Sequence, residues 1–89
     1  MKLPESLKLI TDTLWRIETP EDFSGIFEDI LTPAEITDMA DRITILQMLK
    51  AGKSQRDIAE TLGVSITTVS RGNRVLQYGK GNIDKYLLS

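Results

Sequence analysis

The segment from Ser54 to Leu76 constrains the fold more than any other part of the chain, because it has the pattern of two short helices joined by a sharp corner. Ser54 and Ser65 are expected N-caps of the two helices, since a serine hydroxyl accepts a hydrogen bond from an amide of the first turn. Gly63 lies at the corner, where glycine readily adopts the left-handed conformation that ends a helix. These residues together predict a helix-turn-helix.

The second of these helices has an apolar side and a polar side. Val69, Gly72 and Leu76 recur at helical spacing on the side that we expect to pack against the rest of the domain. The opposite side carries hydroxyl groups and arginines, which suit the base edges and phosphates of a DNA major groove. Its members are Thr67, Ser70, Arg71 and Arg74, and Ile66 is suited to contact a thymine methyl group. The alternative is an ordinary helical hairpin whose polar face is only solvated.

The charge of the chain is unevenly distributed along it. Residues 1–50 contain five Lys or Arg and ten Asp or Glu, a net charge of −5, whereas residues 51–89 contain six and three, a net charge of +3. This asymmetry predicts an acidic scaffold that carries a basic surface for nucleic acid. Because +3 is a small charge, a single copy should bind DNA weakly, and a second copy would strengthen binding.

Composition argues against several functional classes. The absence of Cys and His excludes thiol nucleophiles, disulfides and nearly all zinc chemistry, and no cluster of metal ligands is visible. We find no nucleophile–base pairing or phosphate-binding loop, so we expect no catalytic residues and no enzyme activity. No apolar run approaches the length of a membrane span, and the start MKLPESLK lacks a signal-peptide core. We expect a soluble cytoplasmic protein, associated with the nucleoid, that has no membrane partner.

Two amphipathic helices are expected near the N-terminus. An apolar stripe predicts a first helix over residues 4–17, and Thr19 followed by Pro20 marks the start of a second. Stripes of this kind are usually plain core. Here the core of so short a chain is thin, and the apolar residues of 7–17 and 23–30 exceed what a helix-turn-helix needs. We therefore expect part of them to meet a second subunit in a homodimer.

A third helix is expected at the centre of the domain. Thr32 and Glu35 fit a capping box, in which each residue satisfies an amide of the other. The helix should run from Pro33 to about Ala51, and its apolar residues cover so wide an arc that it should contact neighbours on several sides. With a last short helix capped by Asn82, the expected fold is a single all-α domain, residues 1–89, of about six helices.

The stretch of roughly residues 31–79 resembles the Trp repressor family. The resemblance rests on LTPAE at the start of the central helix, Arg42 within it, AGKSQRDIAETLG around the first helix of the motif, and ITTVSRG in the second. It implies an all-helical, interlocked dimer that binds an operator and acts as a repressor when L-tryptophan is bound as corepressor.

The resemblance also implies two sets of site residues. Arg42 and Arg71 match the two arginines that in the family flank the indole ring and hold the ligand carboxylate. Leu31, Thr32 and Gly72 match further positions of the ligand pocket. The positions that match residues near DNA are Gln55, Arg56, Ser65, Ile66, Thr67, Thr68 and Ser70.

One departure from the family concerns the ligand. Val75 stands where the repressor has a serine near the ammonium group, and an ammonium left without a hydrogen bond typically costs about 1–3 kcal/mol. The ending Gln77-Tyr78-Gly79 also resembles a related group of small bacterial regulators that share both arginines.

Three alternatives to a tryptophan-dependent repressor therefore stay open. The first is a ligand-independent regulator, in which Arg42 pairs with Asp38 or Asp41 and Arg71 contacts a phosphate. The second is a DNA-recognition module of a transposition system, although 89 residues leave no room for the catalytic segment that normally accompanies one. The third is a helical bundle that binds only other proteins.

Overall fold

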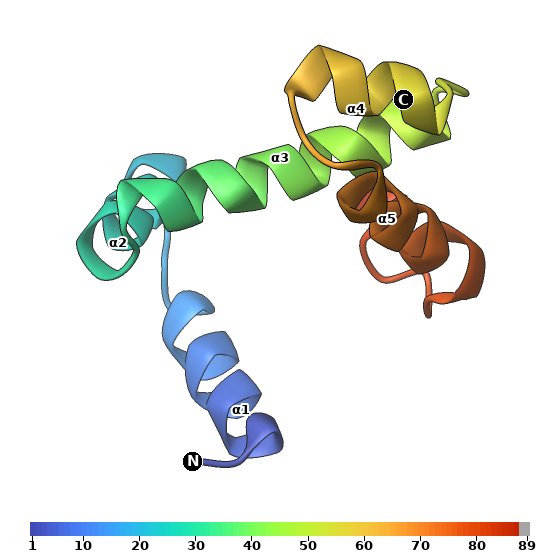
Figure 1. Ribbon diagram of the computed structural model, residues 1–89. Helices are drawn as coiled ribbons and strands as arrows, with labels where there is room; N and C mark the ends of the chain where they lie inside the picture. The colour runs from blue at the N-terminus through green and yellow to red at the C-terminus, as the bar shows by residue number, and fades with distance from the viewer. Residues whose placement is uncertain (88–89) are drawn as a thin grey trace. The chain divides into compact units, whose positions relative to one another are not determined.

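The computed structural model describes residues 1–87, and within them five α-helices are followed by one short 3-10 helix (Figure 1). No strand occurs in this described range, so the expected all-α class is confirmed. The last element, expected as a short helix after Asn82, is a single 3-10 turn. The elements are α1 (Leu3–Leu14), α2 (Pro20–Ile30), α3 (Pro33–Lys50), α4 (Gln55–Leu62), α5 (Ile66–Tyr78) and η1 (Asp84–Tyr86).

The helix boundaries of the motif form as the sequence predicts. The Ser54 hydroxyl oxygen accepts a hydrogen bond of 3.1 Å from the amide of Asp57, and the Ser65 hydroxyl oxygen accepts one of 3.1 Å from the amide of Thr68. Gly63 has a φ of +68°, in the left-handed region that a residue with a side chain rarely adopts. Ser54 and Gly63 thus mark the two ends of α4, and Ser65 marks the start of α5.

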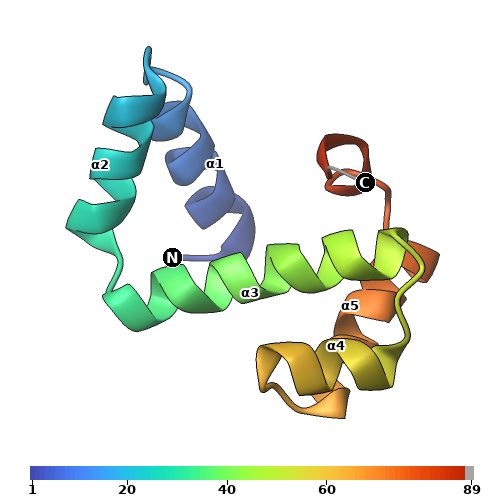
Figure 2. The same cartoon turned by 90° about the horizontal axis from the view of Figure 1, so that it is seen from above.

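The chain divides into two compact units, residues 1–36 and residues 37 onward. The core of the second unit forms where its three helices meet, and α4 and α5 both lie against the C-terminal half of α3 (Figures 1 and 2). Ile45 of α3, Ile58 of α4 and Val69 of α5 are at most 1% exposed. The apolar side chains packed around them are Met48, Leu49, Ala59, Leu62 and Val64.

A glycine determines how closely α5 approaches α3. A Cβ atom at Gly72 would lie 2.8 Å from the Cγ2 atom of Ile45 and 3.5 Å from the Cδ1 atom of Leu49. Ile45 is buried and β-branched, so it could not move aside without disturbing its neighbours. The two helices therefore pack at this distance because residue 72 has no side chain.

The first unit has a different character, because neither α1 nor α2 contains a buried residue. Trp15 is 88% exposed, and Leu7 and Ile10 on the apolar side of α1 are each more than half exposed. On α2, the rings of Phe23 and Phe27 contact each other with centroids 5.0 Å apart. The apolar surface of both helices is thus largely uncovered.

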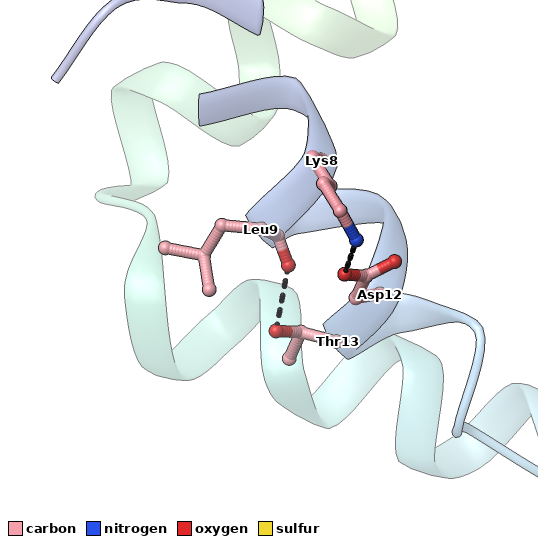
Figure 3. Close-up of polar contacts among 4 residues, drawn as sticks. All are labelled: Lys8, Leu9, Asp12 and Thr13. Carbon is pink, nitrogen blue, oxygen red and sulfur yellow. Dashed lines mark hydrogen bonds and ion pairs between the residues drawn. The ribbon is translucent and has the colours of Figure 1, made fainter. Parts of the chain in front are cut away.

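The side-chain polar contacts of α1 lie within its own exposed surface. Figure 3 shows Lys8 Nζ paired with Asp12 Oδ2 at 2.6 Å, one turn apart, and the Thr13 hydroxyl donating to the carbonyl oxygen of Leu9 at 2.8 Å. An exposed ion pair at this spacing contributes only about 0.3–0.5 kcal/mol. These contacts therefore stabilise the helix locally and give little to the stability of the unit.

The start of α3 is a complete capping box, as expected. The Thr32 amide donates to Glu35 Oε1 at 2.9 Å, and the Glu35 amide donates to Thr32 Oγ1 at 3.2 Å. Hydrogen bonds from the backbone and then the side chain of Thr32 favour the ionised carboxylate and lower the pKa of Glu35 below its ordinary value of 4.5.

This lowered pKa predicts a dependence of stability on pH. A group with a lower pKa in the folded state stabilises the fold fully above its ordinary pKa, and that stabilisation is lost as the pH falls through the lowered value. Replacing Glu35 with Gln keeps an acceptor oxygen but removes the titration. The difference in unfolding free energy between wild type and Glu35→Gln should therefore be constant near neutral pH and shrink below the ordinary value of 4.5.

Urea unfolding from about pH 7 to about pH 3 measures this difference. Glu60→Gln on α4 is a control for removing an exposed carboxylate that has no capping partner in the described range. A difference between wild type and Glu35→Gln that did not vary with pH would contradict the prediction.

Candidate nucleic-acid interface and ligand pocket

The corner between α4 and α5 holds the two helices of the motif close together. The Val64 amide donates to the carbonyl oxygen of Ala59 at 3.1 Å, which closes the turn that Gly63 begins. Ala59 and Val64 are both half-buried against the core residue Val69 and its neighbours. The geometry is that of the expected helix-turn-helix, with α5 as the helix available for a DNA groove.

The side of α5 opposite Val69 is accessible. Thr67, Arg71 and Arg74 are exposed, and Ile66 at the first position of the helix is 51% exposed. These residues form a surface of one apolar side chain, hydroxyl groups and guanidinium groups. Such a surface can donate to phosphates and to base edges in a major groove.

The arginines of this surface and of α4 have no ion-pair partner in the part of the chain that the structure describes. Over residues 1–87 the ion pairs are Lys8–Asp12 and Lys50–Asp84, so Arg56, Arg71 and Arg74 have no acidic partner there. An unpaired guanidinium at the surface is available to a phosphate or a carboxylate.

Four other residues expected near DNA form two hydrogen-bonded pairs of side chains. Ser65 and Thr68 are exposed, and their hydroxyl oxygens lie 2.9 Å apart in the first turn of α5. Gln55 and Ser70 are half-buried, and the Ser70 hydroxyl donates to Gln55 Oε1 at 2.8 Å. Spacing along a single helix gave no signal for this second contact, which joins α4 to α5.

A pocket of about 340 Å³ lies between α3 and α5. It brings together Arg42 of α3 and Arg71 of α5, the two arginines that the resemblance assigns to a ligand. The full lining is Arg42, Ile45, Leu46, Thr68, Arg71, Gly72 and Val75. A volume of this size accommodates a small planar molecule.

The pocket lining combines two cationic groups with an apolar wall. Arg42 is exposed and forms no ion pair with Asp38 or Asp41, among the side chains that the structure describes. Val75 is 45% exposed and contributes a branched apolar group. Guanidinium groups bind carboxylates through paired hydrogen bonds, so the pocket suits a carboxylate attached to an apolar group.

Sequence reasoning identified only part of this lining. Val75, expected beside the ammonium group of a ligand, does line the pocket, whereas Ile45, Leu46 and Thr68 were not expected as pocket walls, and Thr68 was assigned to DNA. The missed signal is a pair of helical stripes, one at residues 42, 45 and 46 and the other at residues 68, 71, 72 and 75. Leu31 and Thr32, the remaining expected ligand positions, belong to the first unit, where Leu31 is the C-cap of α2 and Thr32 caps α3.

Crossing a bilayer needs a long apolar helix, and none of the helices in residues 1–87 meets that requirement.

The family profile and the similar proteins found by comparison point to the same family. The sequence profile of the family described as Trp repressor protein matches residues 5–89. The Trp operon repressor homolog of Xylella fastidiosa (strain M23) is 36% identical over 88 residues, which cover 98% of this chain and 94% of that protein. A Trp operon repressor homolog of Chlamydia caviae is 43% identical over 63 residues, covering 70% of this chain and 62% of that protein.

A third relative has no assigned function. The uncharacterized protein YerC of Bacillus subtilis is 29% identical over 75 residues, covering 84% of this chain and 72% of that protein. No solved structure matches the chain. The family profile spans nearly all of the sequence and the Xylella relative is similar over the same length, so the chain belongs to the Trp repressor family, a family of DNA-binding regulators.

Proposed function

We propose that this protein is a sequence-specific regulator of transcription that binds double-stranded DNA through α5 and acts as a repressor. The observation that carries the proposal is the accessible surface of α5, on which Arg71 and Arg74 have no acidic partner in residues 1–87. Val69 on the opposite side is completely buried, so the helix is held at a fixed rotation with that surface outward. Relatives named Trp operon repressor homolog support the same role.

We further propose that the protein acts as a homodimer, built on the apolar surfaces of α1 and α2. These helices contain no buried residue, although both have a clear apolar side. Large exposed apolar surfaces of this kind mark interaction sites in soluble proteins. A symmetric dimer would also present two copies of α5, and the net charge of +3 on residues 51–89 makes a second copy valuable for affinity.

The proposed effector is a small carboxylate that carries a planar apolar group, with L-tryptophan as the first candidate. Arg42 lies on α3 and Arg71 on α5, so a carboxylate bound by both would fix the orientation of one helix against the other. The ring of such a ligand would lie against the apolar wall that Ile45, Leu46 and Val75 form in the pocket. Such a ligand changes DNA affinity only as far as it favours the binding-competent orientation, and about 1–3 kcal/mol of coupling would be ordinary.

Arg74→Ala tests the DNA-binding surface. We expect weaker binding of duplex DNA and a dependence of log affinity on log salt that is reduced by about one per copy, because one phosphate contact is lost. The thermal midpoint should stay nearly unchanged, since Arg74 is exposed. Val69→Asp is the contrasting variant, which should unfold the domain because it buries an unpaired charge.

Fluorescence anisotropy at several salt concentrations and thermal unfolding measure both effects. Equal losses of stability in the two variants would contradict the assignment of faces. DNA binding should weaken steeply as the salt concentration rises. If the protein shows no such salt-dependent binding of duplex DNA, and instead binds other proteins equally well at high salt, it is a helical bundle that contacts proteins through apolar surfaces.

The oligomeric state tests the role of the first two helices. Light scattering at micromolar concentration should give twice the mass of the chain, which is 10.0 kDa. Leu7→Glu places a charge on the exposed apolar side of α1 and should reduce the dimer fraction, whereas Thr11→Glu is a control that adds the same charge at an exposed polar position of α1. A stable monomer at that concentration would exclude the dimer and the binding of two half-sites.

Calorimetric titration with L-tryptophan tests the effector. Val75 provides an internal comparison, because Val75→Ser supplies a hydroxyl for the ammonium group and should tighten binding by up to about tenfold. Affinity for DNA is then measured with and without the ligand. No heat of binding, no effect on DNA affinity and no gain from Val75→Ser would together indicate a ligand-independent regulator.

A further inference from the structure

We infer that Ser70 is a positioning residue, whose hydroxyl holds the carboxamide of Gln55 so that the amide nitrogen donates to a phosphate of the DNA backbone. The inference rests on the proposed DNA-binding function and deepens it. The resemblance places both residues near DNA and assigns them no separate roles. Here Gln55 contacts the phosphate, and Ser70 acts only through Gln55.

The geometry that carries this inference is a single hydrogen bond between helices. The Ser70 hydroxyl on α5 donates to Gln55 Oε1 on α4 at 2.8 Å, across 15 residues of sequence. Within residues 1–87 it is the one hydrogen bond between side chains that joins these two helices. Both residues are half-buried, so the bond is partly protected from competing water.

The bond uses the acceptor of the carboxamide and leaves its donors free. A glutamine side chain has one acceptor oxygen and two N–H donors. The oxygen of Gln55 is occupied by Ser70, whereas its nitrogen has no hydrogen-bond partner in the described part of the chain. No buried side-chain nitrogen or oxygen in that part lacks a partner, so the Gln55 amide nitrogen reaches the surface.

The same bond restricts what Ser70 can do. A serine hydroxyl has one hydrogen, and here that hydrogen is donated to Gln55. Ser70 therefore has no donor left for a base acceptor or a phosphate oxygen. Its half-buried position also keeps it farther from solvent than Thr67 and Arg74 on the same helix.

Two observations favour a phosphate over a base as the partner of Gln55. Gln55 is the first residue of α4, and the first helix of a helix-turn-helix crosses the DNA backbone while the second enters the groove. Arg56, the next residue, is exposed and has no acidic partner in residues 1–87, so a free guanidinium beside Gln55 is available to the same DNA backbone. Fixing the carboxamide in advance reduces the side-chain entropy that binding would otherwise cost.

The experiment is a double-mutant cycle read on two DNA duplexes. One duplex is selected by the wild-type protein from a random pool, and the other has random sequence. The cycle uses Ser70→Ala, Gln55→Ala and the double variant. Ser70→Thr restores a hydroxyl. Thr67→Ala removes an exposed hydroxyl of the DNA-binding surface that has no bond to Gln55 in the described structure, so any loss of affinity that it causes should multiply with the loss in Gln55→Ala.

A phosphate contact is independent of base sequence. Ser70→Ala and Gln55→Ala should therefore each lower the affinity for the two duplexes by the same factor, about threefold to tenfold. The double variant should be no weaker than Gln55→Ala alone, because Ser70 acts only through Gln55. Ser70→Thr should recover the affinity of the wild type. Gln55→Glu keeps an acceptor for Ser70 but replaces the donor with a negative charge, so it should bind both duplexes more weakly than Gln55→Ala.

Several results would overturn the inference. If Ser70→Ala lowers the affinity for the selected duplex alone, or selects a different sequence from the random pool, then Ser70 contacts a base. If the two losses of affinity multiply in the double variant, the two residues act independently. A lower thermal midpoint without a change in affinity would make the bond purely structural. If the wild type bound neither duplex, the proposed function itself would fail, and the inference with it.

Discussion

The second unit depends on the packing of three side chains where α3, α4 and α5 meet. Ile45, Ile58 and Val69 are almost completely buried, and full burial of one such side chain contributes about 1.5–3 kcal/mol. The exposed Lys8–Asp12 pair, by contrast, contributes a few tenths of a kcal/mol. Apolar burial therefore determines the rotation of α5, and that rotation determines which side chains are presented outward and which line the pocket.

Local signals in the sequence predicted most of the helix starts and the corner of the motif. Ser54, Thr32 and Ser65 each cap a helix, and Gly63 adopts the left-handed conformation, because these interactions involve residues within three or four positions of one another. The end of α1 was predicted less well: the apolar stripe continues to residue 17, whereas the helix ends at Leu14. Periodicity records which side is apolar and does not record where the backbone leaves the helix.

The candidate site shows the same division between local and distant interactions. The polar side of α5 and the two arginines could be identified from helical spacing and family resemblance. The bond between Ser70 and Gln55 and the pocket walls Ile45 and Leu46 could not, because they depend on the angle between helices that are far apart in the sequence. Thr68 shows how one residue can satisfy two roles: its amide donates to the Ser65 cap, and its side chain lines the pocket beside Arg71.

The close approach of α5 to α3 at Gly72 has a consequence for how this protein can evolve. A side chain at position 72 would occupy space that already belongs to the Cγ2 methyl group of Ile45. Substitutions at the two positions are therefore coupled. A larger residue at position 72 becomes acceptable only after, or together with, a smaller residue at position 45. Because Ile45 also belongs to the buried core and to the pocket wall, such a paired exchange would change the shape of the pocket and the stability of the domain in the same step.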